Sequence, residues 1–150
     1  MGYLGGLLCT ALLVFATAAA AAESPVGTIK AVVGTAFVVR RGTAASAQPS
    51  EKVFRGDVFK TGADGSLGIM FADDTSLSLG PNTHIILEEF LFAPAKGELG
   101  FVARILRGTA AYLSGIIGKL SPESVRIETP VAAVGIRGTR LLVKIDDDGV

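Results

Sequence analysis

Cysteine, histidine and tryptophan are almost missing from this 150-residue chain. Cys9 is the only cysteine, His84 is the only histidine, and there is no tryptophan. Without a cysteine beyond residue 9, the rest of the chain has no internal disulfide, thiol nucleophile or thiolate metal site. His84 follows a Pro-Asn-Thr turn, where we expect the first residue of a strand rather than a catalytic base. We therefore expect no enzyme activity, with no catalytic, cofactor-binding or metal-binding residue.

An excess of either charge is missing as well. Lysine and arginine total 14, as do aspartate and glutamate, so no long-range field favours nucleic acid or an acidic ligand. The acidic run at residues 146–148, followed by Gly149, has the composition of a calcium-binding loop. Aligning that glycine with the glycine of such a loop puts Lys144 at the first ligand position, where a carboxylate is needed. We expect neither nucleic acid nor calcium as a partner.

The N-terminal segment contains the longest apolar run. Residues 4–22 carry no charge and end in Ala20-Ala21-Ala22, the pattern of a signal peptide with its cleavage site. We predict a signal peptide helix over residues 1–22, cleavage after Ala22, release into the periplasm or the extracellular space, and only transient membrane contact. An uncleaved anchor is the alternative, since the run would span roughly 28 Å as a helix. Cys9 is not expected to carry lipid, because Gly6-Leu7-Leu8 lacks the small residues that precede a lipidated cysteine.

The remaining chain is rich in β-branched and apolar residues interrupted by glycine. Its turn signals recur about every 8 to 12 residues, as in a sandwich, a barrel or a short β-solenoid. We predict a single all-β domain over residues 26–145, sandwich-like or short β-solenoid-like, with about ten short strands. The expected strands include 27–33, 35–39, 67–71, 75–79, 83–92, 99–106, 109–113, 124–128 and 139–145. Residues 43–52 are expected to form a loop, and residues 115–121 a turn or one turn of helix.

Alternating apolar residues between positions 67 and 79 predict a hairpin with one buried face. A three-residue loop, Ala72-Asp73-Asp74, places Ile69 opposite Leu77, whereas a two-residue loop would mix the two faces. The last residue of such a loop, Asp74, is expected in the left-handed conformation. The predicted core consists of Phe37, Val39, Leu67, Ile69, Phe71, Leu77, Leu79, Ile85 and Leu87.

Two acidic pairs and a repeated tripeptide have structural interpretations. We expect Asp73-Asp74 at a hairpin tip and Glu88-Glu89 at a partly solvated strand end. Arg-Gly-Thr occurs three times, at residues 41–43, 107–109 and 137–139. Each glycine suits a bend and each threonine the start of a strand. Arg107 and Arg137 are candidate interaction residues, although an exposed arginine beside a strand-start turn is the interpretation that we favour.

Several segments in order resemble the FecR-type domain. They are Phe54-Arg55-Gly56-Asp57-Val58-Phe59-Lys60-Thr61-Gly62, residues 65–79, Pro81-Asn82-Thr83, Leu106-Arg107-Gly108-Thr109 and residues 128–139. The resemblance implies an all-β periplasmic module that works by protein contact. Such modules are best known from regulators that relay iron-siderophore signals from an outer-membrane transporter to a cytoplasmic sigma factor. Only three residues precede the apolar run, so we expect no sigma-binding segment here.

Two classes of function therefore stay open. The first is a protein-interaction module in envelope signalling or assembly, with an envelope or outer-membrane protein as its partner. The alternative is a ligand-binding module for glycan. Sugar sites usually stack on aromatic rings, and Tyr112 is the only tyrosine after the leader, which argues against this alternative.

The end of the chain offers candidate interaction residues. The last predicted strand is followed by hairpin-turn residues and then by Val150 alone, which leaves one strand edge without a partner. Leu141, Val143 and Ile145 lie on this strand and are candidates for contact. FecR-like domains generally continue with further strands. The C-terminus is therefore either truncated, the explanation that we favour, or its open edge accepts a strand from a partner or a second copy of the chain.

Overall fold

The computed structural model describes residues 23–136 and 138–146, and in this part of the chain the protein is all-β. The predicted signal peptide lies outside the described residues. Twelve strands form one open, curled sheet, in which nearly all neighbours are antiparallel. The predicted fold class is confirmed, with twelve strands in place of about ten.

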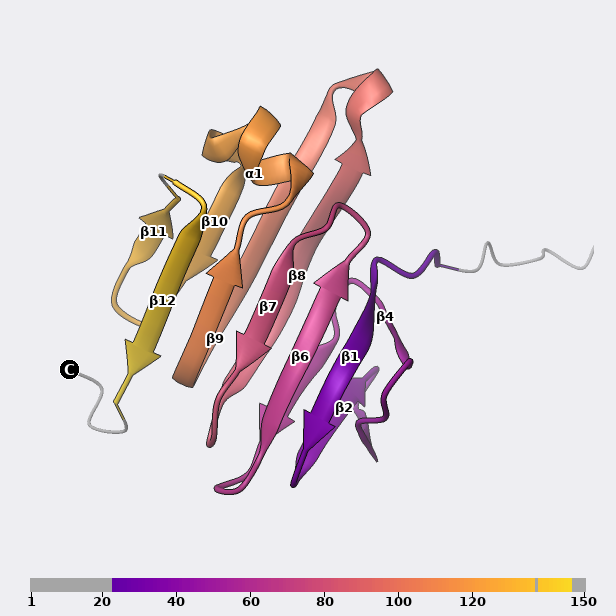
Figure 1. Cartoon of the computed structure of the whole chain (residues 1–150), viewed down its shortest axis with the longest axis vertical. Helices are drawn as coiled ribbons and strands as arrows, with labels where there is room; N and C mark the ends of the chain where they lie inside the picture. The colour runs from indigo at the N-terminus through magenta and orange to yellow at the C-terminus, as the bar shows by residue number, and fades with distance from the viewer. Residues whose placement is uncertain (1–22, 137, 147–150) are drawn as a thin grey trace, which may run out of the picture.

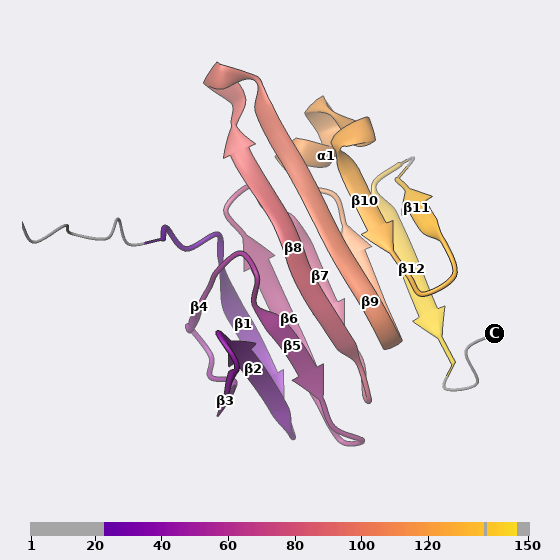
Figure 2. The same cartoon turned by 180° about the vertical axis from the view of Figure 1, so that it is seen from behind.

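The sheet curls because β9, Glu98–Leu113, belongs to two layers (Figure 1). Its first half pairs with β8 and its second half with β7. In order, the front layer contains β4 (Lys52–Val53), β1 (Gly27–Val33), β6 (Ser66–Phe71), β7 (Ser76–Leu79), the second half of β9, and β12 (Arg140–Ile145). The back layer, seen in Figure 2, contains β3 (Thr43–Ser46), β2 (Ala36–Arg40), β5 (Val58–Thr61), β8 (His84–Ala93), the first half of β9, β10 (Val125–Glu128) and β11 (Ala133–Gly135).

Three short helices complete the fold. The 3₁₀ turn η1, Pro94–Lys96, joins β8 to β9 at the tip of their long hairpin. After β9 the chain forms α1, Ile116–Leu120, and η2, Pro122–Ser124. These two helices carry the chain back so that β10 lies parallel to the first half of β9. Of the two conformations expected for residues 115–121, the structure has the helical one.

A single apolar core lies between the two layers. The hairpin of β6 and β7 has the predicted register, with Ile69 opposite Leu77, and Asp74 has the predicted positive φ of 66°. Seven of the nine predicted core residues are at most 2% exposed, and they are Leu67, Ile69, Phe71, Leu77, Leu79, Ile85 and Leu87. A period of two is therefore a dependable guide wherever apolar and small polar residues alternate cleanly.

The core prediction is wrong in β2. Phe37 is 39% exposed and Val39 is half-buried, whereas Val38 is 3% exposed. This strand is apolar at consecutive positions, so its sequence does not indicate which face points inward. The chain turns at Gly34, where φ is 62°, and the strand then begins at Ala36 with its even-numbered side chains on the core.

The expected loop at residues 43–52 contains β3 and the first residue of β4, and it closes one end of the sheet. Ala47 N–H donates to Ala36 O of β2 (2.9 Å), and Ser50 N–H donates to Ile29 O of β1 (2.8 Å). The segment therefore connects the edge of the back layer to the edge of the front layer. We call the end formed by β1 to β4 the closed end. The sequence did not predict β3, because its four residues are all exposed and it therefore lacks an apolar face.

Two further expectations need correction. Residues 99–106 and 109–113 form one strand, because Gly108, with a φ of 91°, lets β9 bend and continue. Glu88 and Glu89 are partly exposed as expected, but they lie in the middle of β8 at a bulge rather than at a strand end. His84 is the first residue of β8, as predicted.

Candidate interaction site

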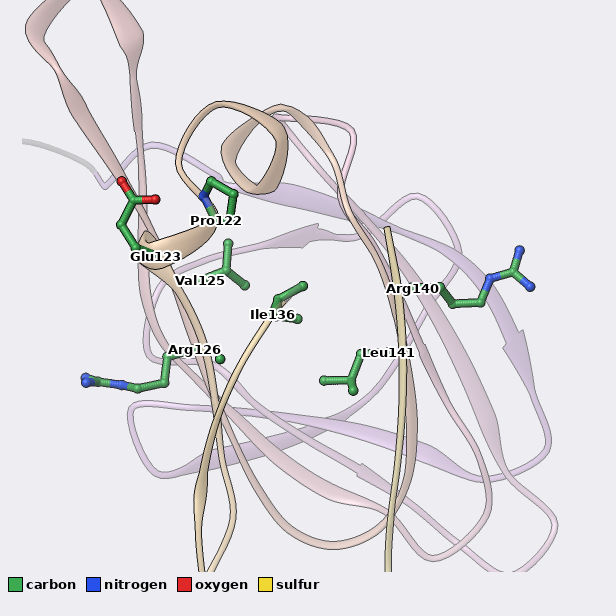
Figure 3. Close-up of a pocket in the computed structure, with 8 residues that line it drawn as sticks. Pro122, Glu123, Val125, Arg126, Ile136, Arg140 and Leu141 are labelled. Atoms are coloured by element: carbon green, nitrogen blue, oxygen red, sulfur yellow. The ribbon is translucent and has the colours of Figure 1, made fainter. Parts of the chain in front are cut away.

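The two layers separate at the end of the sheet opposite the closed end. Here β10 and β11 extend the back layer while β12 extends the front layer, and a groove of about 730 Å³ lies between them. Val125, Ile136 and Leu141 point into it, whereas Arg126 and Arg140 point away (Figure 3). We call this groove and the flanking β12 the open end. Its apolar floor and charged rim are typical of a protein-contact surface.

Strand β12 has a free edge in the part of the chain that the structure describes, since β9 is its only partner there. Ser114 N–H, just after β9, donates to Thr139 O (2.7 Å). Because backbone groups alternate in direction along an antiparallel strand, Arg140, Leu142 and Lys144 direct their N–H and C=O groups toward the free edge. The strand thus offers an unused hydrogen-bonding edge about six residues long.

The predicted contact residues of β12 face inward. Leu141, Val143 and Ile145 are half-buried and pack against the core, while Arg140, Leu142 and Lys144 are exposed. Leu142 is the most exposed large apolar side chain of the strand, at 69%. The strand lies where the sequence predicts it. Its alternate apolar residues, which were the predicted contact residues, form the face that packs toward the core.

The two candidate arginines are not brought together by any described contact. Arg137 lies outside the described residues. Arg107 is exposed on β9 and pairs in register with His84 of β8. Burial lowers the pKa of His84, and the positive charges of Lys60 and Arg107 lower it further. Arg107 is one residue before Gly108, which faces Ile145 at the end of β12, so it borders the open end.

Asp57 is buried and fixes the turn before β5. Its carboxylate, 1% exposed, accepts hydrogen bonds from Arg40 Nε (2.8 Å), Arg40 Nη2 (2.7 Å) and the Phe54 N–H (2.9 Å). The Arg40 guanidinium also lies over the Phe54 ring, 4.6 Å from its centroid. This bidentate contact raises the pKa of Arg40. Asp57 therefore holds the closed end together, a role that sequence alone did not indicate.

Asp73 lies in the hairpin loop, as expected, but its side chain is buried there. It is 0% exposed, and its carboxylate accepts from Thr75 N–H (3.1 Å), Thr75 Oγ1 (2.7 Å) and Ile117 N–H (3.1 Å). The loop is where the parity argument placed it, but α1 packs over it. A side chain at Gly115 would meet Asp73 O at 2.3 Å, so glycine permits this close approach.

A family model described as FecR protein matches residues 57–150, more than half of the chain. This chain belongs to the FecR family. No curated protein and no solved structure matches it. The match includes Asp57, Asp73 and every residue of the open end. The resemblance carried by the sequence segments is thereby confirmed.

Two of the FecR segments meet in space. Thr83, from Pro-Asn-Thr, accepts a hydrogen bond from Thr109 N–H (3.0 Å), and Thr83 Oγ1 lies 2.9 Å from Gly80 O, to which it donates. A side chain at Gly108 would meet Thr83 Cα at 2.4 Å. The threonines of these two FecR-like segments therefore fix a turn and the bend of β9.

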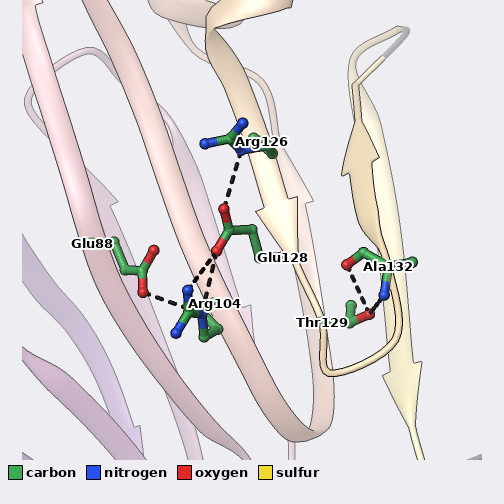
Figure 4. A network of polar contacts seen from close by, with 6 residues as sticks. All are labelled: Glu88, Arg104, Arg126, Glu128, Thr129 and Ala132. Atoms are coloured by element: carbon green, nitrogen blue, oxygen red, sulfur yellow. Dashed lines mark hydrogen bonds and ion pairs between the residues drawn. The ribbon is translucent and has the colours of Figure 1, made fainter.

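The back face of the FecR domain carries an exposed ion-pair network next to the groove (Figure 4). Arg104 of β9 contacts Glu88 (3.2 Å) and Glu128 (3.0 Å), and Arg126 contacts Glu128 (3.2 Å). The hydrogen bond from Arg104 is the main reason that the pKa of Glu128 is lowered. The network joins β8, β9 and β10, so it fixes the back wall of the open end.

Two features are absent from the residues that the structure describes. Within 23–136 and 138–146, no group of three or more potential metal ligands lies close together. Over the same ranges, no helix is both long and apolar enough to span a membrane.

Proposed function

We propose that this FecR-family chain is an exported, non-catalytic protein-interaction module that acts in signalling or assembly at the cell envelope. The apolar run at residues 4–22 supports export. Family membership supports envelope association and a signalling-related role. The observation that carries the proposal is the open end, where a strand edge that is free in the described part of the chain runs beside an apolar groove. The partner is a protein that adds a β-strand to β12.

Strand addition fits the open end better than a small ligand does. The outward backbone groups of β12 supply hydrogen bonds along an extended chain, and alternate side chains of that chain would reach toward Ile136 and Leu141. The same outward groups offer little to a compact molecule.

Site-specific photocrosslinking in cells tests the proposal. A photoreactive amino acid replaces Leu142 on the free edge, and the matched control replaces Ala45, an exposed residue of the edge strand β3 at the closed end. We expect a covalent protein adduct at Leu142, identified by mass spectrometry and confirmed by a reciprocal crosslink from the captured protein. Equal or absent crosslinking at the two positions would contradict the proposal.

Export is tested separately by intact mass. The protein recovered from the periplasmic fraction should begin at Glu23. A full-length species in the membrane fraction would instead establish an uncleaved anchor.

A further inference from the structure

The outer face of β12 has an ordered sequence of charges. Arg140, Leu142, Lys144 and Asp146 are all exposed, and Lys144 Nζ lies 3.5 Å from Asp146 Oδ1, as expected for residues on one face. A positive residue thus stands at the start of the strand and a negative residue directly after its end. Charges at a free edge usually discourage strand addition, but this arrangement is complementary to itself when the strand is reversed.

A second β12 in antiparallel orientation meets the first in only a few registers. Residues whose backbone groups point outward must face one another, so the numbers of paired residues add up to an even total. When the total is 286, Arg140 faces Asp146 of the second copy and Leu142 faces Lys144 of the second copy. Both contacts occur twice because the pairing is symmetric.

The neighbouring registers are disfavoured by charge. A total of 284 places Arg140 opposite Lys144 of the second copy, and a total of 288 places the two Lys144 side chains opposite each other. Like charges directly across a strand pair are destabilising. Of these three registers, charge complementarity therefore favours the total of 286.

The inward face of the strand suits the same register. Leu141 then faces Ile145 of the second copy, and the two Val143 residues face each other. All three side chains are half-buried and already pack against the core of their own chain. Pairing would join the apolar rows of two chains into one continuous layer.

We propose that the strand received by β12 is the β12 of a second copy of this chain, paired antiparallel with Val143 on the twofold axis. This rests on the proposed function, because it names the partner of the same free edge. The occupant is a second copy rather than an unrelated strand because the charge complementarity lies within the chain's own sequence.

A disulfide trap tests the register. In the exported protein, with Cys9 changed to Ser so that no other thiol is present, Val143→Cys places two thiols directly across the axis. Such a pair has Cα atoms about 4.5 Å apart, which lies within the range that a disulfide bridges. We expect a covalent dimer under mild oxidation, and much less from the control Ala45→Cys. Equal trapping at both positions, or none at residue 143, would overturn the register.

A charge exchange and a proline test the pairing itself. We expect Arg140→Asp and Asp146→Arg each to weaken dimerisation, measured by sedimentation, by about 10-fold or more, since two attractive pairs become repulsive. The double variant should regain most of the lost affinity. Lys144→Pro removes only an outward N–H and should abolish the dimer while the intramolecular ladder with β9 stays intact. Failure of the double variant to recover, or a dimer that tolerates Lys144→Pro, would overturn the proposal.

The two proposals fail in different ways. If the protein is monomeric at all accessible concentrations while Leu142 crosslinks to another protein, the second copy is the wrong partner and strand addition stands. If Leu142 captures no protein of any kind, the proposed function itself is wrong. A crosslink between two copies of this chain supports both.

Discussion

The two ends of the curled sheet differ in how far the chain covers them and pairs their strand edges. At the closed end, the segment between β3 and β4 bonds to both layers through Ala47 and Ser50, and Ile29 and Val53 beneath it are 0% exposed. At the open end the layers part around a groove, and among residues 23–136 and 138–146 nothing but β9 pairs with β12. Both ends have the same two-layer construction. Within the described residues, the chain therefore covers one end of the sheet and has a free strand edge at the other.

Truncation of apolar side chains should show the largest difference between the ends. Ile29→Ala empties a fully buried site and should lower the free energy of unfolding by about 2 to 5 kcal/mol. Leu141→Ala, at the half-buried edge of the groove, should cost clearly less because the site already opens to solvent. Urea unfolding of both variants measures the difference, and equal losses would mean that the open end is as closely packed as the closed end.

Substitutions of polar residues should also destabilise the closed end more than the open end, with smaller losses in the free energy of unfolding. Asp57→Asn leaves Arg40 and the Phe54 N–H without their carboxylate at a site only 1% exposed, so we expect a loss of about 1 to 3 kcal/mol. Glu128→Gln in the exposed network of the open end should have a much smaller effect, since surface ion pairs contribute little. Thermal unfolding measures the loss of stability in each variant. A larger loss for Glu128→Gln than for Asp57→Asn would contradict the expected difference between the two ends.

The features that sequence predicted are those set by local pattern. Alternation between Leu67 and Leu79 fixed the parity of the hairpin loop, and from that parity came the register and the positive φ of Asp74. The continuous apolar run around Phe37 lacked such a pattern, and its face was assigned wrongly. Local periodicity therefore predicts a strand's inward face only when polar residues interrupt it.

The features that sequence missed depend on contacts between distant residues. Asp57 meets Arg40 across 17 positions, and Asp73 meets Ile117 across 44. The residues that flank Asp57 and Asp73 in the sequence do not indicate that these two carboxylates are buried. At the candidate site, strand β12 was predictable from composition. Which residues face outward depended on its pairing with β9, which the sequence does not show.

The pH dependence of the open end tests its ion-pair network. Arg104 lowers the pKa of Glu128, so this pair adds stability above the ordinary glutamate pKa, and the contribution is lost as the pH falls through the lowered value. The difference in Tm between the protein and Glu128→Gln should therefore be present near neutral pH and shrink below about pH 4. A difference that grows on acidification would mean that the pKa is shifted the other way.

The smallest expected effect lies in the loop between β6 and β7, where two adjacent aspartates have opposite surroundings. Asp74 is exposed and has a φ of 66°, a conformation that glycine adopts without strain, so Asp74→Gly should stabilise the protein by about 0.5 to 1 kcal/mol. Asp73→Gly is the matched control and should destabilise it, because Thr75 and Ile117 would lose their acceptor. Thermal unfolding of the two variants should show a higher Tm for Asp74→Gly and a lower Tm for Asp73→Gly. A loss of stability in Asp74→Gly would show that the aspartate side chain contributes more through its own contacts than its backbone strain costs.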